Sequence, residues 1–354
     1  MIYLDNAATT RVTEPILEVM LPYFKENYGN PSSLYSLGRK SKRAVDTARE
    51  QVAKAINAKP EQIFFTSGAT ESNNWVISNF NCVLCSKVEH HSILNNPKCH
   101  QSDFSELAKA IRKNNADLVT YMLVNNETGQ IFDIKPLVEI THKIGILFHT
   151  DATQAFGHIP IDVKELDVDS LSLSGHKFHA PKGVGILYLK DPSKYKPLFY
   201  GGHQEKNLRA GTENTAGIAA IGKTAELYNF SKEKDDICRT VQDKFYSTFN
   251  GMSDVWFNTN IKNSIPTTLN LAFKNVESES LMILLDSDGI CVSSGAACNS
   301  GSLEPSHVLR AMGTPEEYIY NSIRLSWDET ITLKEANTVI ESIKNNVEKI
   351  RGYV

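Results

Sequence analysis

Three short segments carry residue types that could do chemistry together: an anion-binding turn, a buried acid and a lysine. The turn is Ser67-Gly68-Ala69-Thr70, which follows an apolar segment and precedes a helical pattern. Backbone N–H groups at a helix N-terminus, beside hydroxyl side chains, favour a bound anion such as phosphate. The turn matches neither the Walker A pattern nor GxGxxG, so a capped helix after a tight turn is the alternative interpretation.

Asp151 and Lys177 each follow a strand-like segment. In an open α/β sheet, ligands bind at the carboxyl ends of the strands, and a buried carboxylate there needs a cationic partner. A lysine in the same position can act as a Schiff-base nucleophile when desolvation lowers its pKa. Taken singly, each residue has another interpretation, because Asp151 could cap the helix that follows and Lys177 could lie on the surface.

Together, the three segments indicate pyridoxal 5′-phosphate (PLP). The turn would hold the phosphate, the acid would keep a proton on the pyridine nitrogen, and the lysine would form a Schiff base with the aldehyde. No nicotinamide or nucleotide cofactor uses all three groups. We therefore predict PLP as the cofactor.

A cysteine in an unusual environment adds a candidate nucleophile. Cys298 lies in SSGAACNSGSLEP, whose small residues are typical of an exposed loop. Cys291 lies between Ile290 and Val292 and is predicted to be a packing residue. An exposed thiol can be reactive whereas a buried one is inert, so a reactive role and a packing role both stay open for Cys298 at this point.

The chain resembles the cysteine desulfurases of the NifS and IscS type, which form part of the class V branch of fold-type-I PLP enzymes. The resemblance covers nearly the whole length and rests on motifs that occur in the same order. These motifs are YLDNAATT, YGNPSSLYSLGRK, FTSGATESNN, VEHHSIL, VNNETG, HTDATQAFGHIPID, LSLSGHKFHAPKGVG, RAGTEN, VSSGAACNSGSLEPSHVLRAMG and SIRLS.

The resemblance implies which residues bind the cofactor. Lys177 would carry it covalently, Asp151 would pair with the pyridinium nitrogen, and Gln154 would hydrogen-bond the ring hydroxyl. Thr212 would reach the phosphate bound in the other subunit of a homodimer. The full set implied to contact PLP is Ala69, Thr70, Asn126, Asp151, Gln154, Ser174, His176, Lys177 and Thr212.

The resemblance also implies the reaction, with Lys177, His90 and Cys298 as the catalytic residues. His90 would stack on the ring and act as acid and base, and Asn126 and Arg324 would bind the substrate carboxylate. Cys298 would take the sulfur of L-cysteine as a persulfide and leave L-alanine. The sulfur would go to an acceptor such as an iron–sulfur scaffold or a tRNA-thiolation enzyme. Selenocysteine lyase, another class V PLP enzyme and a catalytically impaired persulfide scaffold stay open as alternatives.

The elements that must position these residues alternate between strand and helix patterns. Such alternation predicts a mostly parallel sheet of the seven-stranded type between helices, as in a fold-type-I PLP-dependent transferase. We predict a large PLP-binding α/β domain at residues 14–250. Residues 1–13 and 251–354 would form a smaller α+β domain that carries the Cys298 loop.

Two segments depart from the family pattern. Between VEHHSIL and SDFSELAKAIRK only residues 95–101 remain, which is shorter than usual and threatens one edge strand of the sheet. After Arg324, Trp327-Asp328 replaces the usual Leu-Gly pair, so we expect a different pocket shape there.

Composition excludes several other classes of protein. The 354 residues are 41% apolar and 22% charged with a formal net charge of −4, which gives no electrostatic basis for nucleic-acid or membrane binding. No apolar stretch reaches the length of a membrane span, and the N-terminus resembles no targeting segment. Six cysteines in a chain of this length indicate reduced thiols and a cytoplasmic protein.

A zinc site is the remaining alternative for part of the chain. The candidate ligands are Cys82, Cys85, His90, His91, Cys99 and His100. Cys-x2-Cys is a zinc-ligand spacing, but a strand places residues three apart on opposite faces. We therefore predict that the protein holds no metal.

Overall fold

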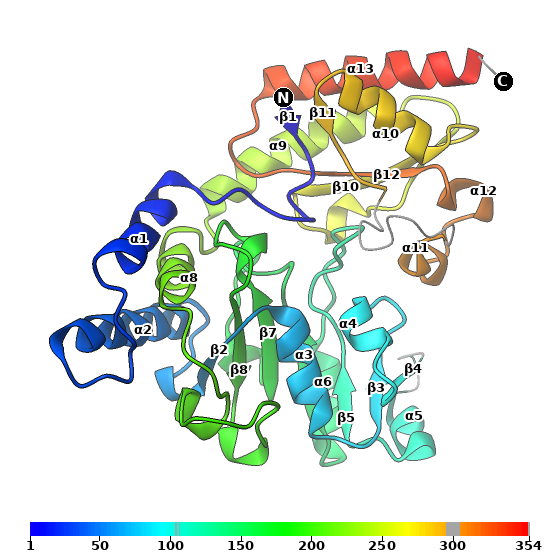
Figure 1. Ribbon diagram of the computed structural model, residues 1–354. Coiled ribbons are helices and arrows are strands. Elements are labelled where there is room, and N and C mark those ends of the chain that lie inside the picture. Colours follow the sequence, from blue (N-terminus) through cyan, green and yellow to red (C-terminus); the bar gives the residue numbers. More distant parts are fainter. Residues whose placement is uncertain (103–104, 106, 295–304, 353–354) are drawn as a thin grey trace. The chain divides into compact units, whose positions relative to one another are not determined.

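The computed structural model describes residues 1–102, 105, 107–294 and 305–352. Within it, the chain forms two compact units (Figure 1). Unit 1 consists of Met1–Thr9, Val124–Ile131 and Phe230–Val354, and unit 2 consists of Thr10–Leu123 and Phe132–Asn229. Cys298, the predicted nucleophile, lies outside the described residues. The domain limits predicted from the sequence stay a prediction.

Unit 2 contains a seven-stranded sheet and its helices. The strands are β2 (Ile63–Thr66), β3 (Val83–Cys85), β4 (Cys99–Gln101), β5 (Leu118–Thr120), β6 (Leu147–Asp151), β7 (Ser170–Ser174) and β8 (Gly185–Leu189). The helices are α1 (Glu14–Lys25), α2 (Ser36–Ala55), α3 (Ala69–Ser78), α4 (His91–Leu94), α5 (Leu107–Asn114), α6 (Lys135–Lys143), α7 (Val163–Leu166) and α8 (Thr215–Leu227).

The order of strands in this sheet is β2-β8-β7-β6-β5-β3-β4. Strand β8 is antiparallel to both of its neighbours, and all the other pairs are parallel. The side chains of β7 and β8 are buried on both faces, as expected for a sheet that helices cover on each side. The predicted fold class is confirmed.

The shortened segment at residues 95–101 still supplies the edge strand. Strand β4 pairs in parallel with β3, with Val83 opposite Cys99. An edge strand of three residues loses few ladder hydrogen bonds when it is shortened. The edge strand is therefore present although the segment is short.

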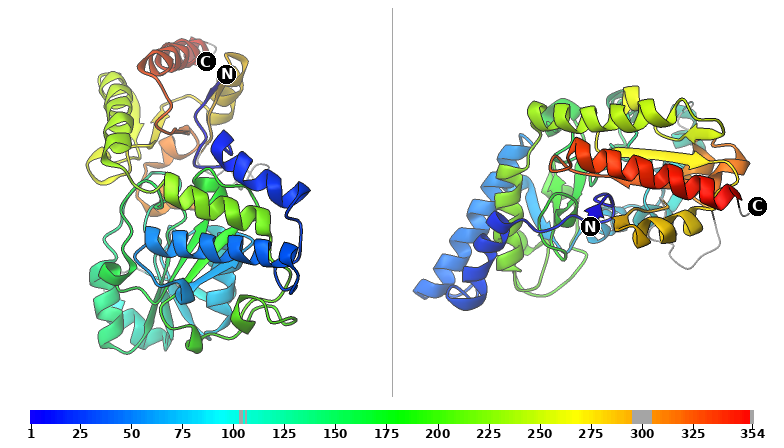
Figure 2. Two further views of the ribbon diagram at one scale, coloured as in Figure 1. Left: turned by 90° about the vertical axis from the view of Figure 1, so that its left-hand side faces the viewer. Right: turned by 90° about the horizontal axis from the view of Figure 1, so that it is seen from above.

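Helices α2 and α8 pack closely because one of them has a glycine at the contact (Figure 2). A Cβ atom at Gly222 would lie 2.4 Å from the Cα atom of Ala48, so no larger residue fits there without movement. Helix α2 buries Val45, Ala48 and Val52 on the side that faces this contact and the sheet, in agreement with its apolar periodicity.

Unit 1 contains two small sheets. Its elements are β1 (Ile2–Tyr3), α9 (Lys232–Phe249), β9 (Val255–Phe257), β10 (Thr268–Phe273), α10 (Ser278–Ser287), β11 (Ile290–Cys291), α11 (His307–Ala311), α12 (Glu316–Ile319), β12 (Ser322–Ser326) and α13 (Leu333–Gly352). Strands β12, β10 and β9 form an antiparallel sheet, and β1 pairs in parallel with β11.

Trp327 belongs to the core of unit 1. Its side chain is 1% exposed, and its ring centroid lies 5.4 Å from that of Phe245. The carboxylate of Asp328 accepts a hydrogen bond from the Thr330 backbone N–H at 2.9 Å. The Trp-Asp pair that departs from the family pattern therefore serves packing and a local turn.

In the described part of the chain, we find no helix with the length and apolar character that a bilayer crossing needs.

A buried ion pair covers the outer edge of β2. Arg49 in α2 donates to both carboxylate oxygens of Glu205, at 2.8 and 2.6 Å. Arg49 also donates to the Ile63 carbonyl at 2.6 Å, and the Phe65 N–H donates to Glu205 at 3.0 Å. Because the backbone groups on the outer edge of a strand need partners, the pair satisfies both the acceptor and the donor that β2 leaves exposed.

We predict that Glu205→Ala destabilises the protein by about 3–5 kcal/mol, because it leaves the Arg49 charge buried without its partner. Asp46→Ala is the matched control, since it breaks the exposed Lys42–Asp46 pair and should cost less than about 1 kcal/mol. Urea denaturation of the two variants measures both changes. Equal losses in the two variants would contradict the importance of the buried pair.

Candidate active site

The predicted Schiff-base lysine lies in a tight turn after β7. The turn is the 3₁₀ segment Gly175–Lys177, and Lys177 is half-buried in it. Thr10 holds this turn, because its backbone N–H and its hydroxyl both donate to the His176 carbonyl, at 2.8 and 3.0 Å. The same hydroxyl accepts from the His179 N–H at 2.7 Å. Thr10, which is far from Lys177 in the sequence, therefore binds the backbone on both sides of Lys177.

Burial and positive charge keep His176 neutral. Burial, together with the positive charges of Lys177 and Lys182, lowers the pKa of His176 to about 4. At neutral pH its ring therefore offers one donor and one acceptor. A neutral donor is compatible with the phosphate-binding role that the family resemblance implies.

Asp151 is the last residue of β6, the strand beside β7. It is 5% exposed. Since β6 and β7 are parallel neighbours, their carboxyl ends place Asp151 and the Lys177 turn at the same edge of the sheet. One carboxylate oxygen accepts from the Asn73 side-chain amide at 2.8 Å, and the other accepts from the Thr153 N–H at 2.9 Å.

The predicted phosphate-binding residues meet where β2 leads into α3. Helix α3 begins at Ala69, and Gly68 precedes it as the N-cap residue. A Cβ atom at Gly68 would lie 3.5 Å from the Ser174 hydroxyl, and one at Gly185 would lie 2.5 Å from the Gly68 Cα atom. The missing side chain at Gly185 thus lets the turn lie directly on β8. The structure thus places the Ser174 hydroxyl beside Gly68, which directly precedes Ala69 and Thr70.

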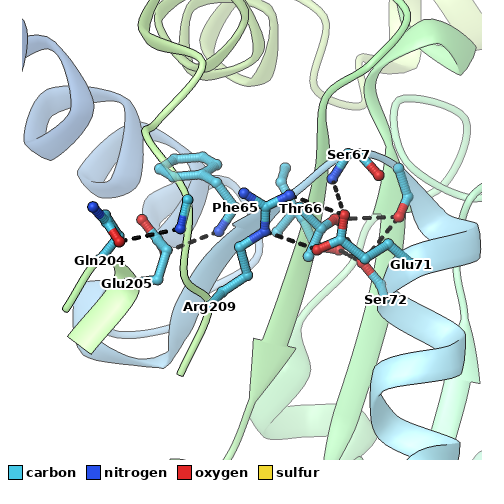
Figure 3. A network of polar contacts seen from close by, with 11 residues as sticks. Phe65, Thr66, Ser67, Glu71, Ser72, Gln204, Glu205 and Arg209 are labelled. Atoms are coloured by element: carbon cyan, nitrogen blue, oxygen red, sulfur yellow. Dashed lines mark hydrogen bonds and ion pairs between the residues drawn. The ribbon is translucent and has the colours of Figure 1, made fainter. Parts of the chain in front are cut away.

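An ion pair ties the RAGTEN segment to this helix (Figure 3). The Arg209 guanidinium donates to both oxygens of Glu71 at 2.9 and 3.2 Å, and the Ser67 N–H donates to the same carboxylate at 2.8 Å. Burial opposes ionisation of Glu71, but these hydrogen bonds prevail and lower its pKa below the ordinary value. Thr212, three residues after Arg209, is exposed.

His90 and Gln154 both lie in unit 2, after strands β3 and β6. His90 is the N-cap of α4, and its Nδ1 atom accepts from the Ser92 N–H at 3.1 Å. Gln154 is 7% exposed and lies in the turn that follows Asp151. The structure therefore places both residues near the carboxyl ends of strands, where ligands bind in this class of sheet.

Asn73 and His149 are buried polar residues that the sequence analysis missed. Both are 0% exposed, and the His149 Nε2 atom lies 3.0 Å from the Asn73 oxygen. His149 could have been found, because it precedes Asp151 by two positions in one strand and so shares its face. Asn73 carries no comparable pattern, since its contact with Asp151 spans 78 positions of sequence.

Glu89, a further residue that sequence reasoning missed, is completely buried beside Asp151. One carboxyl oxygen accepts from the Met122 N–H at 2.8 Å and from the Ser86 hydroxyl at 3.2 Å. Burial first, and then the negative charge of Asp151, raise its pKa well above the ordinary value. Glu89 therefore keeps its proton to a higher pH than an ordinary glutamate does.

In unit 1, Arg324 and Asn126 contact each other. Arg324 in β12 is 1% exposed. Its Nη1 atom donates to the Asn126 carbonyl at 2.8 Å, and its Nη2 atom pairs with the Asp5 carboxylate at 2.7 Å. Asp5, from the YLDNAATT motif, orients the guanidinium and is another residue that the sequence analysis left without a role.

The residues of unit 2 fit PLP. Asp151 is a buried carboxylate whose hydrogen-bond donors are both neutral. Of the described side chains, no lysine or arginine forms an ion pair with it, and its neighbour His149 has a pKa of about 4. A buried carboxylate needs a positive charge nearby. A protonated pyridine nitrogen would supply that charge.

Among the described residues, no group of three or more His, Cys, Asp or Glu side chains is arranged to hold a metal ion.

Comparison with known proteins identifies the family. The family model described as "Aminotransferase class-V" matches residues 2–338. The chain is 41% identical over 376 residues to "Cysteine desulfurase IscS" from Methanosarcina thermophila, with 99% of this chain and 93% of that protein covered. It is 42% identical over 378 residues to the protein of the same name from Dictyoglomus turgidum, covering 99% and 95% of the two chains. A solved structure titled "NifS-like protein" covers both chains completely, with 32% identity and a TM-score of 0.89.

The chain belongs to the class-V aminotransferase family. The resemblance inferred from the motifs is confirmed. Members of this family and the cysteine desulfurases depend on PLP, which agrees with the predicted cofactor. The roles of individual site residues stay predictions.

We predict that Glu89→Gln becomes more stable relative to the native protein as the pH rises. Because the folded pKa of Glu89 is above the ordinary 4.5, the folded state binds an extra proton between pH 4.5 and the folded pKa. Native stability therefore falls with rising pH in that window, by up to about 1.4 kcal/mol per pH unit. Glutamine stays neutral and removes this loss.

Urea denaturation from pH 4.5 to 7.5 measures the difference between the two proteins. Glu18→Gln, at an exposed position, is the control and should show a difference that does not vary with pH. A pH-independent difference for Glu89→Gln would mean that Glu89 is ionised in the fold.

Proposed function

We propose that the chain is a cysteine desulfurase that converts L-cysteine to L-alanine and holds the sulfur on Cys298 as a persulfide. The proposal rests on two residues at the carboxyl ends of neighbouring strands in unit 2. There a lysine turn follows β7, and a buried carboxylate that lacks a lysine or arginine partner among the described side chains ends β6. Curated relatives at 41–42% identity over 99% of the chain carry that name.

Lys177, Asp151 and His90 would perform the proton steps. PLP, when bound, supplies an electron sink for the pair left at the substrate Cα atom. The Lys177 amine would hold the cofactor covalently and later take the Cα proton. Asp151 would hold the proton on the pyridine nitrogen. His90, whose Nδ1 atom accepts from Ser92, would exchange its proton at Nε2.

The cofactor would be held through its phosphate and its ring. The first turn of α3 would bind the phosphate through Ala69 and Thr70, with help from Ser174 and His176. On the ring, Gln154 would hydrogen-bond the hydroxyl group and Asn126 would contact the cofactor. Gly185 supports the phosphate site, because the turn packs on it.

Arg324 and Asn126 would bind the substrate carboxylate. The guanidinium is buried and is oriented by Asp5 and by the Asn126 carbonyl. A planar guanidinium held in this way loses little side-chain entropy when it binds a carboxylate. We propose that this fixed orientation selects α-amino acids with a free carboxylate.

The sulfur step balances without an external oxidant. The Cys298 thiolate would attack the sulfur of the bound cysteine, so that the carbon–sulfur bond breaks and a sulfur–sulfur bond forms. The electron pair of the broken bond stays on the carbon, which takes up a proton and becomes the methyl group of alanine. The products are L-alanine and the Cys298 persulfide.

We predict that Lys177→Ala and Cys298→Ala fail in different ways. Lys177→Ala should lose the cofactor that borohydride fixes to the chain, and should slow alanine formation about 100- to 10,000-fold. Cys298→Ala should keep the cofactor absorbance but lose persulfide and sulfide formation. Cys291→Ala is the control and should behave like the native protein.

Absorbance spectra, alanine assays and sulfide assays distinguish these outcomes. Sulfide formation that Cys298→Ala leaves unchanged would reject the persulfide role. If that variant instead retained full turnover of selenocysteine, the result would favour a selenocysteine lyase. A native chain that cannot bind PLP would favour a persulfide scaffold without catalysis.

We propose a homodimer that uses the loops beside α2 as its interface. Exposed apolar side chains gather in two loops of unit 2: Tyr28, Leu34, Tyr35, Phe199 and Tyr200. Residues of the same two loops, among them Pro31 and Gly202, line one cavity of about 690 Å³. Clusters of exposed apolar side chains are typical of protein interfaces. Thr212 would extend from this region to the phosphate bound by the partner.

A mixed dimer tests whether Thr212 acts in the partner subunit. One subunit carries Lys177→Ala and the other carries Thr212→Ala. If Thr212 acts across the interface, one of the two sites has both native residues, so the mixed dimer should have about half of the native activity. Each homodimeric variant is the control. Activity no higher than in these controls would place Thr212 in the site of its own subunit.

We propose that the persulfide is delivered in a reducing cytoplasm to an iron–sulfur scaffold or a tRNA-thiolation enzyme. The cysteines that the structure describes are Cys82, Cys85, Cys99, Cys238 and Cys291, and all are free thiols. Free thiols support a reducing compartment.

A further inference from the structure

We propose that Asn73 is a positioning residue that aims Asp151 and, through Ser92, also His90, with His149 holding the Asn73 amide in place. The proposal rests on the proposed PLP chemistry and deepens it. All these residues belong to unit 2.

Asn73 uses every polar group of its side chain. Its nitrogen donates to the Asp151 carboxylate at 2.8 Å and to the Ser92 hydroxyl at 2.9 Å. Its oxygen lies 3.0 Å from the Nε2 atom of His149. Because a carboxylate only accepts hydrogen bonds, the nitrogen of the amide must face Asp151. The opposite orientation would place two oxygens in contact in a fully buried site.

His149 supports the same orientation from the oxygen side of the amide. Burial lowers the pKa of His149 to about 4, although the charge of Asp151 opposes the shift. The neutral ring has a single N–H group. Since the Asn73 oxygen only accepts, the proton of His149 belongs on Nε2, and Nδ1 accepts from the Ser170 hydroxyl at 2.8 Å.

The second proton of the Asn73 amide links Asp151 to His90. The Ser92 hydroxyl that accepts from Asn73 lies 2.9 Å from the Nδ1 atom of His90. The Ser92 N–H also points at this atom, at 3.1 Å. Nδ1 of His90 therefore acts as an acceptor, which leaves the ring proton on Nε2. A single amide thus fixes both the acid that faces the pyridine nitrogen and the tautomer of the acid–base histidine.

The charges around Asp151 suit this arrangement. Its buried titratable neighbours are Glu89 and His149, and burial shifts the pKa of each toward the uncharged form. An Asn73 amide donates without adding charge. The negative charge of Asp151 is therefore left for the pyridine nitrogen, and its direction is set by Asn73 and by the Thr153 N–H.

The test measures the protonation of the pyridine nitrogen in full-length protein loaded with ¹⁵N-labelled PLP. The native protein should show a protonated nitrogen by its ¹⁵N chemical shift. Asn73→Ala should shift the signal toward the neutral form and weaken PLP binding about ten-fold, which is the expected effect of losing one hydrogen bond to a charged group. Thermal melting shows whether the variant is folded.

Asn74→Ala is the matched control. Asn74 is the next residue of α3, and its nitrogen donates to the Thr70 carbonyl at 2.9 Å and to the Ser92 carbonyl at 3.2 Å. Asn74→Ala therefore removes a half-buried amide from the same helix without removing a donor to Asp151. The ¹⁵N signal of this control should match that of the native protein.

A second pair of variants covers the case in which Asn73→Ala does not fold. His149→Gln keeps a neutral N–H donor of similar reach, whereas His149→Leu removes it. The Gln variant should keep the native ¹⁵N signal, and the Leu variant should shift it as Asn73→Ala does. ¹⁵N spectra of the imidazole rings in the native protein report the His149 tautomer directly, and a proton on Nδ1 would overturn the proposal.

The outcomes separate this proposal from the proposed function. A native chain that binds no PLP at Lys177 rejects the function. A native chain that binds PLP with a protonated nitrogen, and keeps that signal and affinity in both Asn73→Ala and His149→Leu, rejects only the role of Asn73.

Discussion

A buried carboxylate needs a positive charge, and this requirement organises the centre of unit 2. Asp151 ends β6 with 5% of its surface exposed, and its hydrogen-bond donors, Asn73 and the Thr153 backbone, are neutral. Burial shifts the pKa values of its titratable neighbours Glu89 and His149 toward their uncharged forms. The fold thus places a buried carboxylate at the carboxyl ends of the strands, where a positively charged ligand group would stabilise it.

Segments that are distant in the sequence position the turns around Asp151. They do so through contacts with the backbone of these turns. Thr10 fixes the Lys177 turn through the His176 carbonyl and the His179 N–H. Gly185 lets the turn at Gly68 lie on β8 because it has no side chain. Tight packing of this kind places reactive groups on strand ends, which are more rigid than loops.

The sequence alone was sufficient to predict the sheet, its mostly parallel strands and the candidate residues that lie in contiguous motifs. Asp151 and Lys177 follow apolar segments, and their strand-end positions could be predicted from that pattern. Asn73 and Glu89 could not, because their partners lie far away in the sequence and only the packed sheet brings them together. The environment of Trp327 could not be predicted either, since an aromatic residue after Arg324 can face either a site or a core. Its contact with Phe245 places it in the core.

The Arg49–Glu205 pair has a consequence for the behaviour of the protein in concentrated solution. It occupies the outward carbonyl of Ile63 and the outward N–H of Phe65, so these two groups are not available to a strand from another molecule. At the opposite border of the sheet, β4 offers only Cys99–Gln101 for such pairing. Both borders thus discourage intermolecular β-association and protect the protein against aggregation.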